Sequence, residues 1–276
     1  MLPHVPARPP DLPDFEHPPV VEVALSVQFE PLSYETRHIA LLWDSCRQDF
    51  PEWQDHVPIA PAFELFGEQL SDAGTIFGSP PLRRAIFRNS SHTQLKQYQG
   101  DRFVRNWTKA DSSPTYPRYG SIREPFATDL TNLIDFVAAQ SLGNVVPNQC
   151  EVTYVNLVPL PDGHAQIASV LRPWVGTYSD SFLDAPESTD IACHFVMRDG
   201  GKPIGRLHIA SAMVAYRDTR ERALQLTLTA RGRPLGQAVD GVLAFLDVGR
   251  DHIVRGFASF TTPEAHKTWG RRHAAS

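Results

Sequence analysis

The chain has 276 residues, of which 42% are hydrophobic and 21% are charged. This balance excludes a chain that is disordered throughout, because enough apolar side chains are present to offset the entropy lost on folding. The formal net charge of −5 at pH 7 excludes a surface that is basic overall, but a local basic face stays compatible with it, since electrostatic steering depends on where the charge lies.

The N-terminal residues 1–17 are rich in proline and contain no apolar stretch. A secretory signal needs an apolar region of roughly 7–15 residues, and no run in the chain approaches the roughly 18 apolar residues of a membrane span. This segment therefore predicts a flexible, Pro-rich N-terminal arm on a cytoplasmic protein. Three cysteines that are far apart in the sequence (Cys46, Cys150 and Cys193) fit reduced thiols better than a disulfide framework or a zinc site.

The first half of the chain predicts a strand, a helix, several antiparallel strands and a long helix. Val20–Leu32 alternates apolar and polar residues with a period of two, and Ser33–Phe50 carries an apolar stripe at helical spacing. The next expected elements are short strands at Phe63–Phe66 and Leu82–Arg88, a hairpin of Thr93–Gln99 and Arg102–Lys109, and a helix over Pro125–Gln140. Gly100 at the first of two turn positions indicates a type II′ turn in the hairpin.

Near residue 150 the same order of elements begins again. Glu151–Leu160 echoes Glu22–Leu32 and is one residue shorter. The elements expected after it are a helix carrying Ile167, Val170, Leu171 and Trp174, strands at Ile191–Arg198, Gly205–Arg217 and Ala223–Ala230 with a turn at Gly200-Gly201, and a helix over Leu235–Phe257. Thr262-Pro263-Glu264 is typical of a helix start. We expect Trp269 to anchor this last helix and His266 to face solvent.

The order of elements predicts an α+β fold with a mostly antiparallel sheet, rather than a parallel Rossmann-type sheet. The expected domains are two similar halves, residues 18–146 and residues 147–276, the second of which includes the C-terminal helix. The halves can join into one extended, pseudo-symmetric sheet with the helices on one face. The other face would then stay free for water, a ligand or a partner.

No sequence motif for phosphate binding or nucleophilic catalysis is present, since the chain lacks GxxxxGK[ST], GxGxxG after a strand, and GxSxG. Asp162-Gly163-His164 indicates a turn first and an acid–base pair only second. His194 and His208 can meet on one face of neighbouring strands, as structural histidines or, alternatively, as metal ligands. We expect no cofactor and no metal, and the protein is interpreted as a binding protein rather than an enzyme.

One electrostatic feature rises above this background. Between residues 83 and 123, nine cationic side chains stand against two carboxylates, and aromatic residues lie among them. The predicted partner- or anion-binding residues are Lys96, Arg102, Arg105, Trp107, Lys109, Arg118, Tyr119 and Arg123. Cationic and aromatic side chains on an exposed sheet face favour single-stranded nucleic acid, a phosphorylated ligand or an acidic protein partner.

A structural alternative explains the same residues without a ligand. Phe103 and Trp107 would pack inward, and the arginines would pair with helix carboxylates such as Asp129 and Asp135. An acidic stretch in the second half offers a further explanation, because the two halves or two copies of the chain can meet there; it contains Asp180, Asp184, Glu187 and Asp190.

The opening stretches Pro18–Val23 and Gln28–Leu32 resemble a sporadically distributed bacterial family of uncharacterised proteins of about this length, which begin with a PPxxEV…QFEPL strand. Further matching points are Trp43, Phe50-Pro51, the stretch from Gln97 to Trp107, and Thr261–Glu264 with Trp269. The resemblance covers nearly the whole chain and implies no activity, because none is assigned to the family. Its patchy distribution implies an accessory role beside neighbouring genes.

The sequence thus favours a non-enzymatic binding or accessory protein that uses a basic–aromatic face of its first half. The expected partner is a protein, encoded nearby, or nucleic acid; no membrane partner is expected, and a homo-oligomer is compatible with the sequence. The alternative is a small-molecule-binding protein or an enzyme with a pocket between sheet and helices. A deep pocket that converges on histidine or carboxylate groups would favour this alternative.

Overall fold

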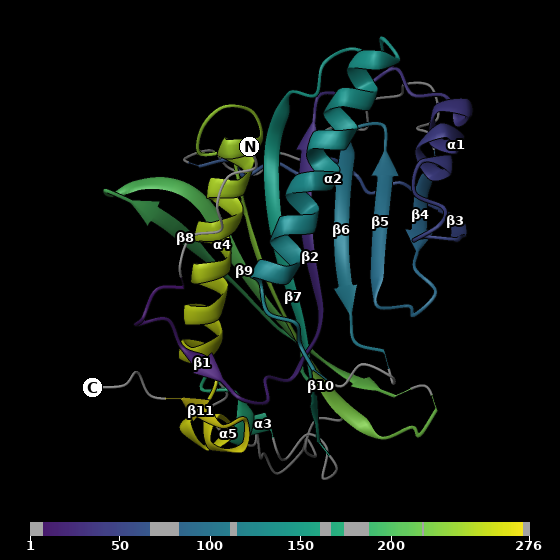
Figure 1. Ribbon diagram of the computed structural model, residues 1–276. Helices are drawn as coiled ribbons and strands as arrows, with labels where there is room; N and C mark the ends of the chain where they lie inside the picture. The colour runs from purple at the N-terminus through teal and green to yellow at the C-terminus, as the bar shows by residue number, and fades with distance from the viewer. Residues whose placement is uncertain are drawn as a thin grey trace.

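The computed structural model describes residues 8–66, 83–110, 115–160, 167–173, 188–216 and 218–272. Within these ranges the protein has a mixed α+β fold with one large antiparallel sheet, a separate pair of short strands and five helices (Figure 1). The large sheet has nine strands in the order β3-β4-β5-β6-β2-β7-β10-β9-β8. The strands are β1 (Asp14–Phe15), β2 (Val20–Phe29), β3 (Glu52–His56), β4 (Arg84–Arg88), β5 (Gln94–Gln99), β6 (Arg102–Thr108), β7 (Pro147–Pro159), β8 (Ile191–Asp199), β9 (Lys202–Ala215), β10 (Arg222–Gly232) and β11 (Arg271–Arg272). The helices are α1 (Thr36–Asp44), α2 (Gly120–Ala139), α3 (Ile167–Val170), α4 (Ala238–Phe260) and α5 (Pro263–Thr268).

The centre of the sheet is the antiparallel pair of β2 and β7. The period of two predicted for β2 is confirmed: Val23, Leu25 and Val27 are fully buried on the face that the helices cover. Their neighbours Glu22, Ala24 and Ser26 point to the opposite, helix-free face, because side chains alternate along a strand. The strand ends at Phe29, two residues before Pro31.

The hairpin of β5 and β6 is confirmed, but the turn type predicted for it is wrong. Gly100 does not adopt the positive φ that a type II′ turn requires at this position. The carbonyl oxygens of Gly100 and Asp101 accept hydrogen bonds from the amides of Leu32 (2.8 Å) and Phe29 (2.9 Å), so contact with the end of β2 shapes the turn. The β8–β9 hairpin turns at Gly200-Gly201 as expected.

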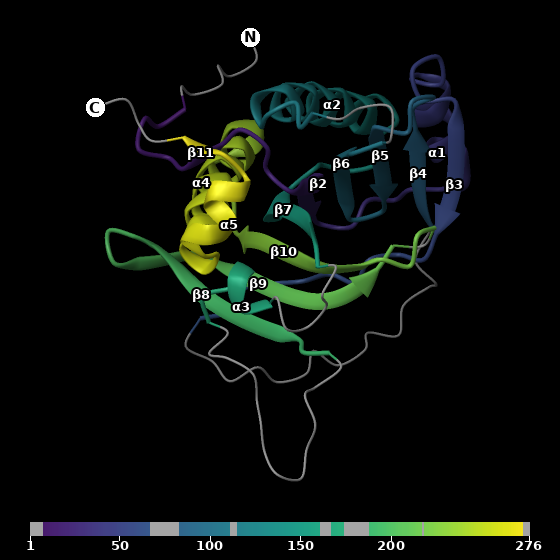
Figure 2. The same cartoon turned by 90° about the horizontal axis from the view of Figure 1, so that it is seen from below.

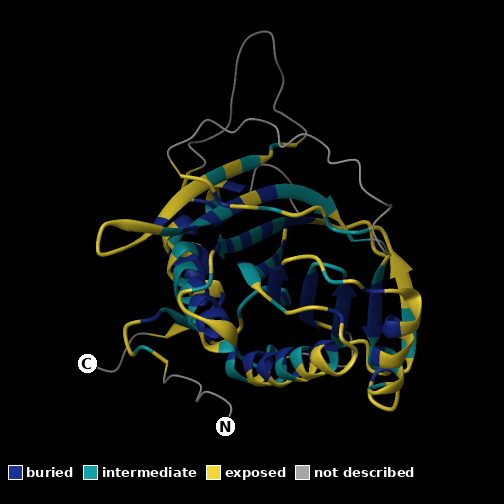
Figure 3. Ribbon diagram, turned by 90° about the horizontal axis from the view of Figure 1, so that it is seen from above, coloured by how far each residue is buried: buried dark blue, intermediate teal, exposed yellow. Residues whose placement is uncertain are grey.

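The long helices α2 and α4 lie side by side on one face of the sheet (Figures 1 and 2). Helix α2 packs its Phe126 ring on Phe103 of β6, with ring centroids 5.5 Å apart. Helix α4 covers β7 and β10, and the buried residues, dark blue in Figure 3, gather between these helices and the sheet. The two long helices therefore share one face of the sheet. Helix α2 begins at Gly120, five residues before the predicted start, and includes Pro125.

The two ends of the described chain meet beside α4. β1 of the N-terminal arm pairs with β11, and the Phe15 ring packs against Phe257 and Trp269. Thr262 caps α5 by accepting a hydrogen bond from the amide of Ala265 (3.2 Å), as predicted. The prediction that His266 faces solvent is wrong: its side chain is buried and hydrogen-bonded to the Thr261 hydroxyl (2.8 Å).

Residues 57–66, called the strap below, cross the helix-free face of the sheet. The strand predicted at Phe63–Phe66 is wrong, since no residue of the strap belongs to a strand. Pro58 and Pro61 lack the amide hydrogen that a sheet ladder needs. The edge strand β3 (Glu52–His56), which the sequence did not predict, comes just before the strap instead.

Several predictions fall on residues that the structure does not describe. These residues are Asp162-Gly163-His164, Trp174, Asp180, Asp184 and Glu187. None of the helices in the described ranges has both the length and the apolar character needed to span a membrane.

Candidate functional site

The predicted basic–aromatic residues are mostly buried, so the expectation of an exposed face is wrong. Six of the eight are buried: Lys96, Arg102, Arg105, Trp107, Tyr119 and Arg123. Arg118 is half-buried and Lys109, just beyond the end of β6, is exposed. Phe103, Arg105 and Trp107 share one face as predicted, but that face lies under helix α2.

Lys96 and Arg105 converge on one carboxylate beneath α2. The Lys96 ammonium lies 2.8 Å from Asp129, and the Arg105 guanidinium also pairs with Asp129. All three side chains are about nine-tenths buried. The structural alternative drawn from the sequence therefore holds for Asp129, whereas Asp135 on the same helix is exposed.

Arg123 and Tyr119 meet the second half of the protein through Asp247 of α4. Arg123 Nε lies 2.7 Å from the Asp247 carboxylate, and the Tyr119 hydroxyl donates to the same group at 2.9 Å. Burial alone would lower the pKa of Arg123, but the hydrogen bond and charge of Asp247 raise it by more. These contacts join the start of α2 to α4.

Arg102 is the one predicted residue on the opposite face of the sheet. It donates to the Gln28 side chain at 2.6 Å and to the Ala60 carbonyl of the strap at 3.3 Å. Burial lowers the pKa of its guanidinium. The eight predicted residues thus lie in several separate environments and form no single surface.

A pocket opens on the helix side of the sheet, where the two halves of the chain meet. Its floor is formed by β2, β7 and β10, and its walls by α4, by the segment leading into α2 and by the N-terminal arm. The polar residues that line it include Asp14, Tyr116, Arg118, Tyr119, Tyr154 and Arg250. Two of the predicted residues, Arg118 and Tyr119, therefore belong to this pocket.

Arg250 is the most unusual group of the pocket. It lies on α4 and is only 5% exposed. Its Nε and Nη1 atoms have no hydrogen-bond partner among the described residues, although Nη1 lies 3.1 Å from Asp251. Its guanidinium carbon is 4.9 Å from the centre of the Tyr119 ring. Because a buried polar group that lacks a hydrogen bond is costly, these donors are poised for a ligand or water.

The phenols beside Arg250 are hydrogen-bond donors rather than acids. The hydroxyls of Tyr116 and Tyr154 lie 2.9 Å apart. Burial raises the pKa of Tyr116 to about 12, and it raises the pKa of Tyr154 well above the ordinary value. Both side chains therefore stay protonated at neutral pH.

Two more arginines stand at the mouth of the pocket. Arg118 Nη1 lies 2.9 Å from Asp14, and Arg8 Nη2 lies 3.6 Å from the same carboxylate. Burial of the partly exposed Arg8 lowers its pKa. The lining thus carries three arginines against Asp14, with Asp251 as a second carboxylate behind Arg250.

Sequence reasoning missed Arg250, although a signal was present. Arg250 follows Leu243 by seven residues and Leu246 by four, which places it on the buried stripe of α4. A cation at this spacing, inside an otherwise apolar stripe, marks a site that needs an anion or a hydrogen-bond acceptor.

The described residues contain no group of three or more metal-ligating side chains. His194 and His208 do meet, as expected, with ring centroids 4.7 Å apart. No protein-family model matches the chain, and no curated protein matches it in sequence. The resemblance of the opening strand to a bacterial family therefore stays a prediction.

Proposed function

We propose that this protein binds a small organic anion in the pocket between the sheet, helix α4 and the segment that leads into α2. The observation that carries the proposal is the buried Arg250 at the wall of a pocket: its Nε donor has no hydrogen-bond partner among the described residues, and its Nη1 donor is ion-paired with Asp251 at 3.1 Å but not hydrogen-bonded. A carboxylate can accept a charge-assisted hydrogen bond from the free Nε donor, and such bonds are among the strong ones. The exposed basic–aromatic surface that favoured a protein or nucleic-acid partner is not supported by the burial of its residues.

The walls of the pocket suit a ligand with an apolar body. Beside the arginines and tyrosines, the lining includes Phe15, Leu228, Ile253 and Phe257. The pocket volume of about 70 Å³ exceeds the roughly 10–15 Å³ that one water needs. The ligand is therefore a compact molecule, such as an aromatic or branched aliphatic carboxylate.

Binding accounts for the pocket better than acid–base catalysis does. A catalytic acid or base works best with a pKa near the working pH. The phenols of Tyr116 and Tyr154 have pKa values raised by burial, and the arginines are cationic, so these groups donate hydrogen bonds without exchanging protons at neutral pH.

We also propose that the pocket formed at the junction of two duplicated halves. The strand order supports this: from the central pair outward it runs β2, β6, β5, β4 on one side and β7, β10, β9, β8 on the other. In each half the first strand of the large sheet, β2 or β7, lies at its centre. The next strands outward are the three that precede the long helix, in reverse sequence order: β6, β5 and β4 in the first half, and β10, β9 and β8 in the second. The long helix, α2 or α4, then follows in the chain. The pocket uses residues from both halves, so a duplication would have created it.

Isothermal titration with benzoate and with neutral benzamide tests the proposal. We expect saturable binding of benzoate and at least tenfold weaker binding of benzamide, because the amide lacks the charge that pairs with Arg250. Arg250→Gln should weaken benzoate binding at least tenfold, whereas the exposed Arg233→Gln, a matched charge removal outside the pocket, should leave it unchanged. Equal affinity for benzoate and benzamide, or an equal loss in both variants, would overturn the proposal.

A further inference from the structure

The helix-free face of the sheet is built to hold an extended peptide backbone. Gln99 accepts from the Ile59 amide and donates to the Ile59 carbonyl, both at 2.8 Å. Gln28 accepts from the Ala62 amide at 2.9 Å. Together with Arg102 and Arg206, which donate to the carbonyls of Ala60 and Leu65, the sheet side chains satisfy five backbone groups of the strap. Contacts to main-chain groups recognise an extended conformation with little regard to its side chains.

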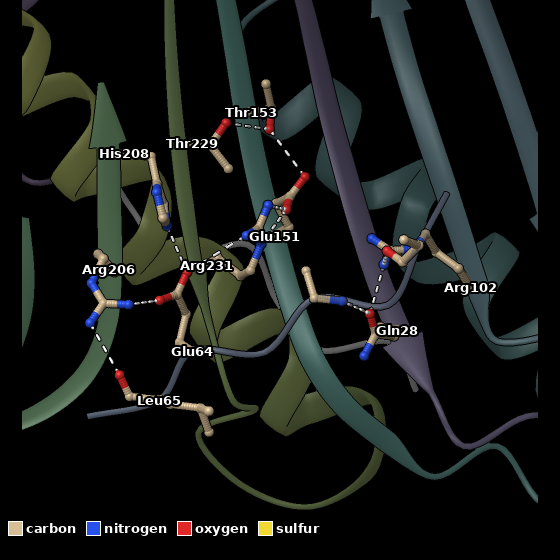
Figure 4. A network of polar contacts seen from close by, with 12 residues as sticks. Gln28, Glu64, Leu65, Arg102, Glu151, Thr153, Arg206, His208, Thr229 and Arg231 are labelled. Carbon is tan, nitrogen blue, oxygen red and sulfur yellow. Dashed lines mark hydrogen bonds and ion pairs between the residues drawn. The ribbon is translucent and has the colours of Figure 1, made fainter. Parts of the chain in front are cut away.

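One side chain of the strap is recognised specifically. The carboxylate of Glu64 enters a cationic cluster of Arg206, His208 and Arg231 on β9 and β10, as Figure 4 shows. His208 Nε2 lies 2.6 Å from Glu64 Oε1, Arg231 Nη1 lies 3.7 Å from it, and Arg206 pairs with the other carboxylate oxygen. The Glu64 side chain is 3% exposed.

The charges of this cluster balance only when Glu64 is present. Arg231 is also paired with Glu151 at 2.6 Å, which leaves Arg206 as the cation that Glu64 neutralises. Burial alone would raise the pKa of the Glu64 carboxyl, but the hydrogen bond of His208 and the nearby positive charges lower it by more. Removing Glu64 would leave the half-buried Arg206 without a carboxylate partner, beside a space shaped for a carboxylate.

The strap fills this site in an unusual way for a structural loop. Three of its large apolar side chains are exposed (Val57 81%, Phe63 52% and Leu65 43%), whereas Ile59 is half-buried. A loop that stabilises a core buries such residues and leaves its carboxylates in water. The strap does the reverse, so its apolar residues contribute little to its attachment and an exchange for another peptide would cost little.

The face beneath the strap also has recognition capacity that the strap does not use. Ser26 Oγ, Gln97 Oε1, Arg102 Nε and both polar atoms of Gln149 are buried without a hydrogen-bond partner among the described residues. The strap covers this region with Ala60-Pro61-Ala62, whose side chains cannot form hydrogen bonds. Ala62 lies beside Ser26 and Gln149 in a crevice too narrow to hold a water molecule.

We infer that the helix-free face is a binding site for an extended peptide of a partner protein that carries a glutamate, and that the strap is an internal peptide competing for the same site. The partner's glutamate takes the place of Glu64 among Arg206, His208 and Arg231. A polar side chain two residues before that glutamate, at the position of Ala62, meets Ser26 and Gln149. The strap thus keeps the site closed until a better-matched peptide displaces it.

The test uses a fluorescent peptide with the sequence of residues 57–66 and fluorescence anisotropy with the full chain. We expect the Glu64→Ala chain to bind this peptide at least tenfold more tightly than the wild-type chain, whose strap occupies the site. A peptide with Glu64→Gln should bind the Glu64→Ala chain at least tenfold more weakly than the original peptide, and a peptide with Ala62→Ser should bind more tightly. Adding Arg206→Gln to the Glu64→Ala chain should abolish peptide binding, whereas adding Arg198→Gln on the neighbouring strand should not.

A second measurement follows the strap in the wild-type chain, so that the test does not depend on a variant that fails to fold. The amides of Ile59 and Ala62 are bonded to Gln99 and Gln28, and excess Ala62→Ser peptide should speed their hydrogen exchange. Unchanged exchange, equal binding of the glutamate and glutamine peptides, or binding of inorganic phosphate but of no peptide would each overturn the inference.

Discussion

Asp129 is the residue on which the buried cations of the first half depend. Its carboxylate holds both Lys96 and Arg105 beneath α2. Asp129→Asn keeps the shape of the side chain but removes the charge, which leaves two buried cations without a carboxylate. Breaking a buried ion pair from one side costs about 3–5 kcal/mol, most of it the cost of the charge left behind.

Urea unfolding measures this cost directly. With a slope of about 3 kcal/mol per molar urea, a loss of 3–5 kcal/mol lowers the midpoint by roughly 1–1.7 M. The matched control is Asp135→Asn, a change of the same kind at an exposed position of the same helix. We expect the control to change the free energy of unfolding by less than about 0.5 kcal/mol.

Two further results distinguish buried cations that depend on Asp129 from an exposed basic face. Replacing Asp129, Lys96 and Arg105 together by apolar residues should restore much of the lost stability, because no buried charge then remains. If Asp129→Asn instead behaves like Asp135→Asn, Lys96 and Arg105 do not depend on the helix carboxylate. The exposed basic face would then have to be reconsidered.

Two other predictions concern the second half of the chain. Burial, with the charges of nearby arginines, lowers the pKa of His266 to about 4 from its ordinary value of 6.5. As the pH falls, the unfolded chain therefore binds a proton at His266 before the folded chain does. The free energy of unfolding should fall by on the order of 3 kcal/mol as the pH drops from about 6.5 to about 4. Urea midpoints across this range should show the decline in the wild type and a smaller one in His266→Gln, and parallel curves would contradict the assignment. A Cβ on Gly232 would lie 2.4 Å from both the Ile204 carbonyl and the Phe245 ring, so Gly232→Ala should cost about 1–3 kcal/mol. A Cβ on Gly100 would meet no atom nearer than 4.0 Å, so Gly100→Ala should leave the thermal unfolding temperature nearly unchanged. A large loss of stability in Gly100→Ala would instead support the type II′ turn predicted from the sequence.

The regular elements could be predicted because each follows from local periodicity. The alternation in β2, the β5–β6 hairpin and the apolar stripes of α2 and α4 are properties of short windows of sequence. The antiparallel sheet with helices on one face then follows from their order along the chain.

The strap could not be predicted from its own residues. Phe63–Phe66 alternates apolar and polar residues like a strand, but its position is set by Arg206 and His208, which lie far away in the sequence. The same limit applies to the basic–aromatic residues. The spacing of Phe103, Arg105 and Trp107 gave their common face correctly, but only tertiary packing decided that α2 covers that face.

The pocket is assembled from distant parts of the chain rather than from a sequence motif. Arg250 comes from α4, Tyr116 precedes α2, and Tyr154 belongs to the central strand β7, so no continuous stretch of sequence carries the site. A search for sequence motifs therefore finds nothing here, although the side chains converge in space.

The most direct test of the account is a nuclear magnetic resonance titration that follows the Nε–H signal of Arg250 as benzoate is added. We expect a saturable shift of this signal, together with slower exchange of its proton with water, while the signals of exposed arginines such as Arg233 stay in place. An Arg250 signal that does not move while benzoate is present in excess, or equal shifts of all arginine signals, would contradict the claim that this pocket binds organic anions.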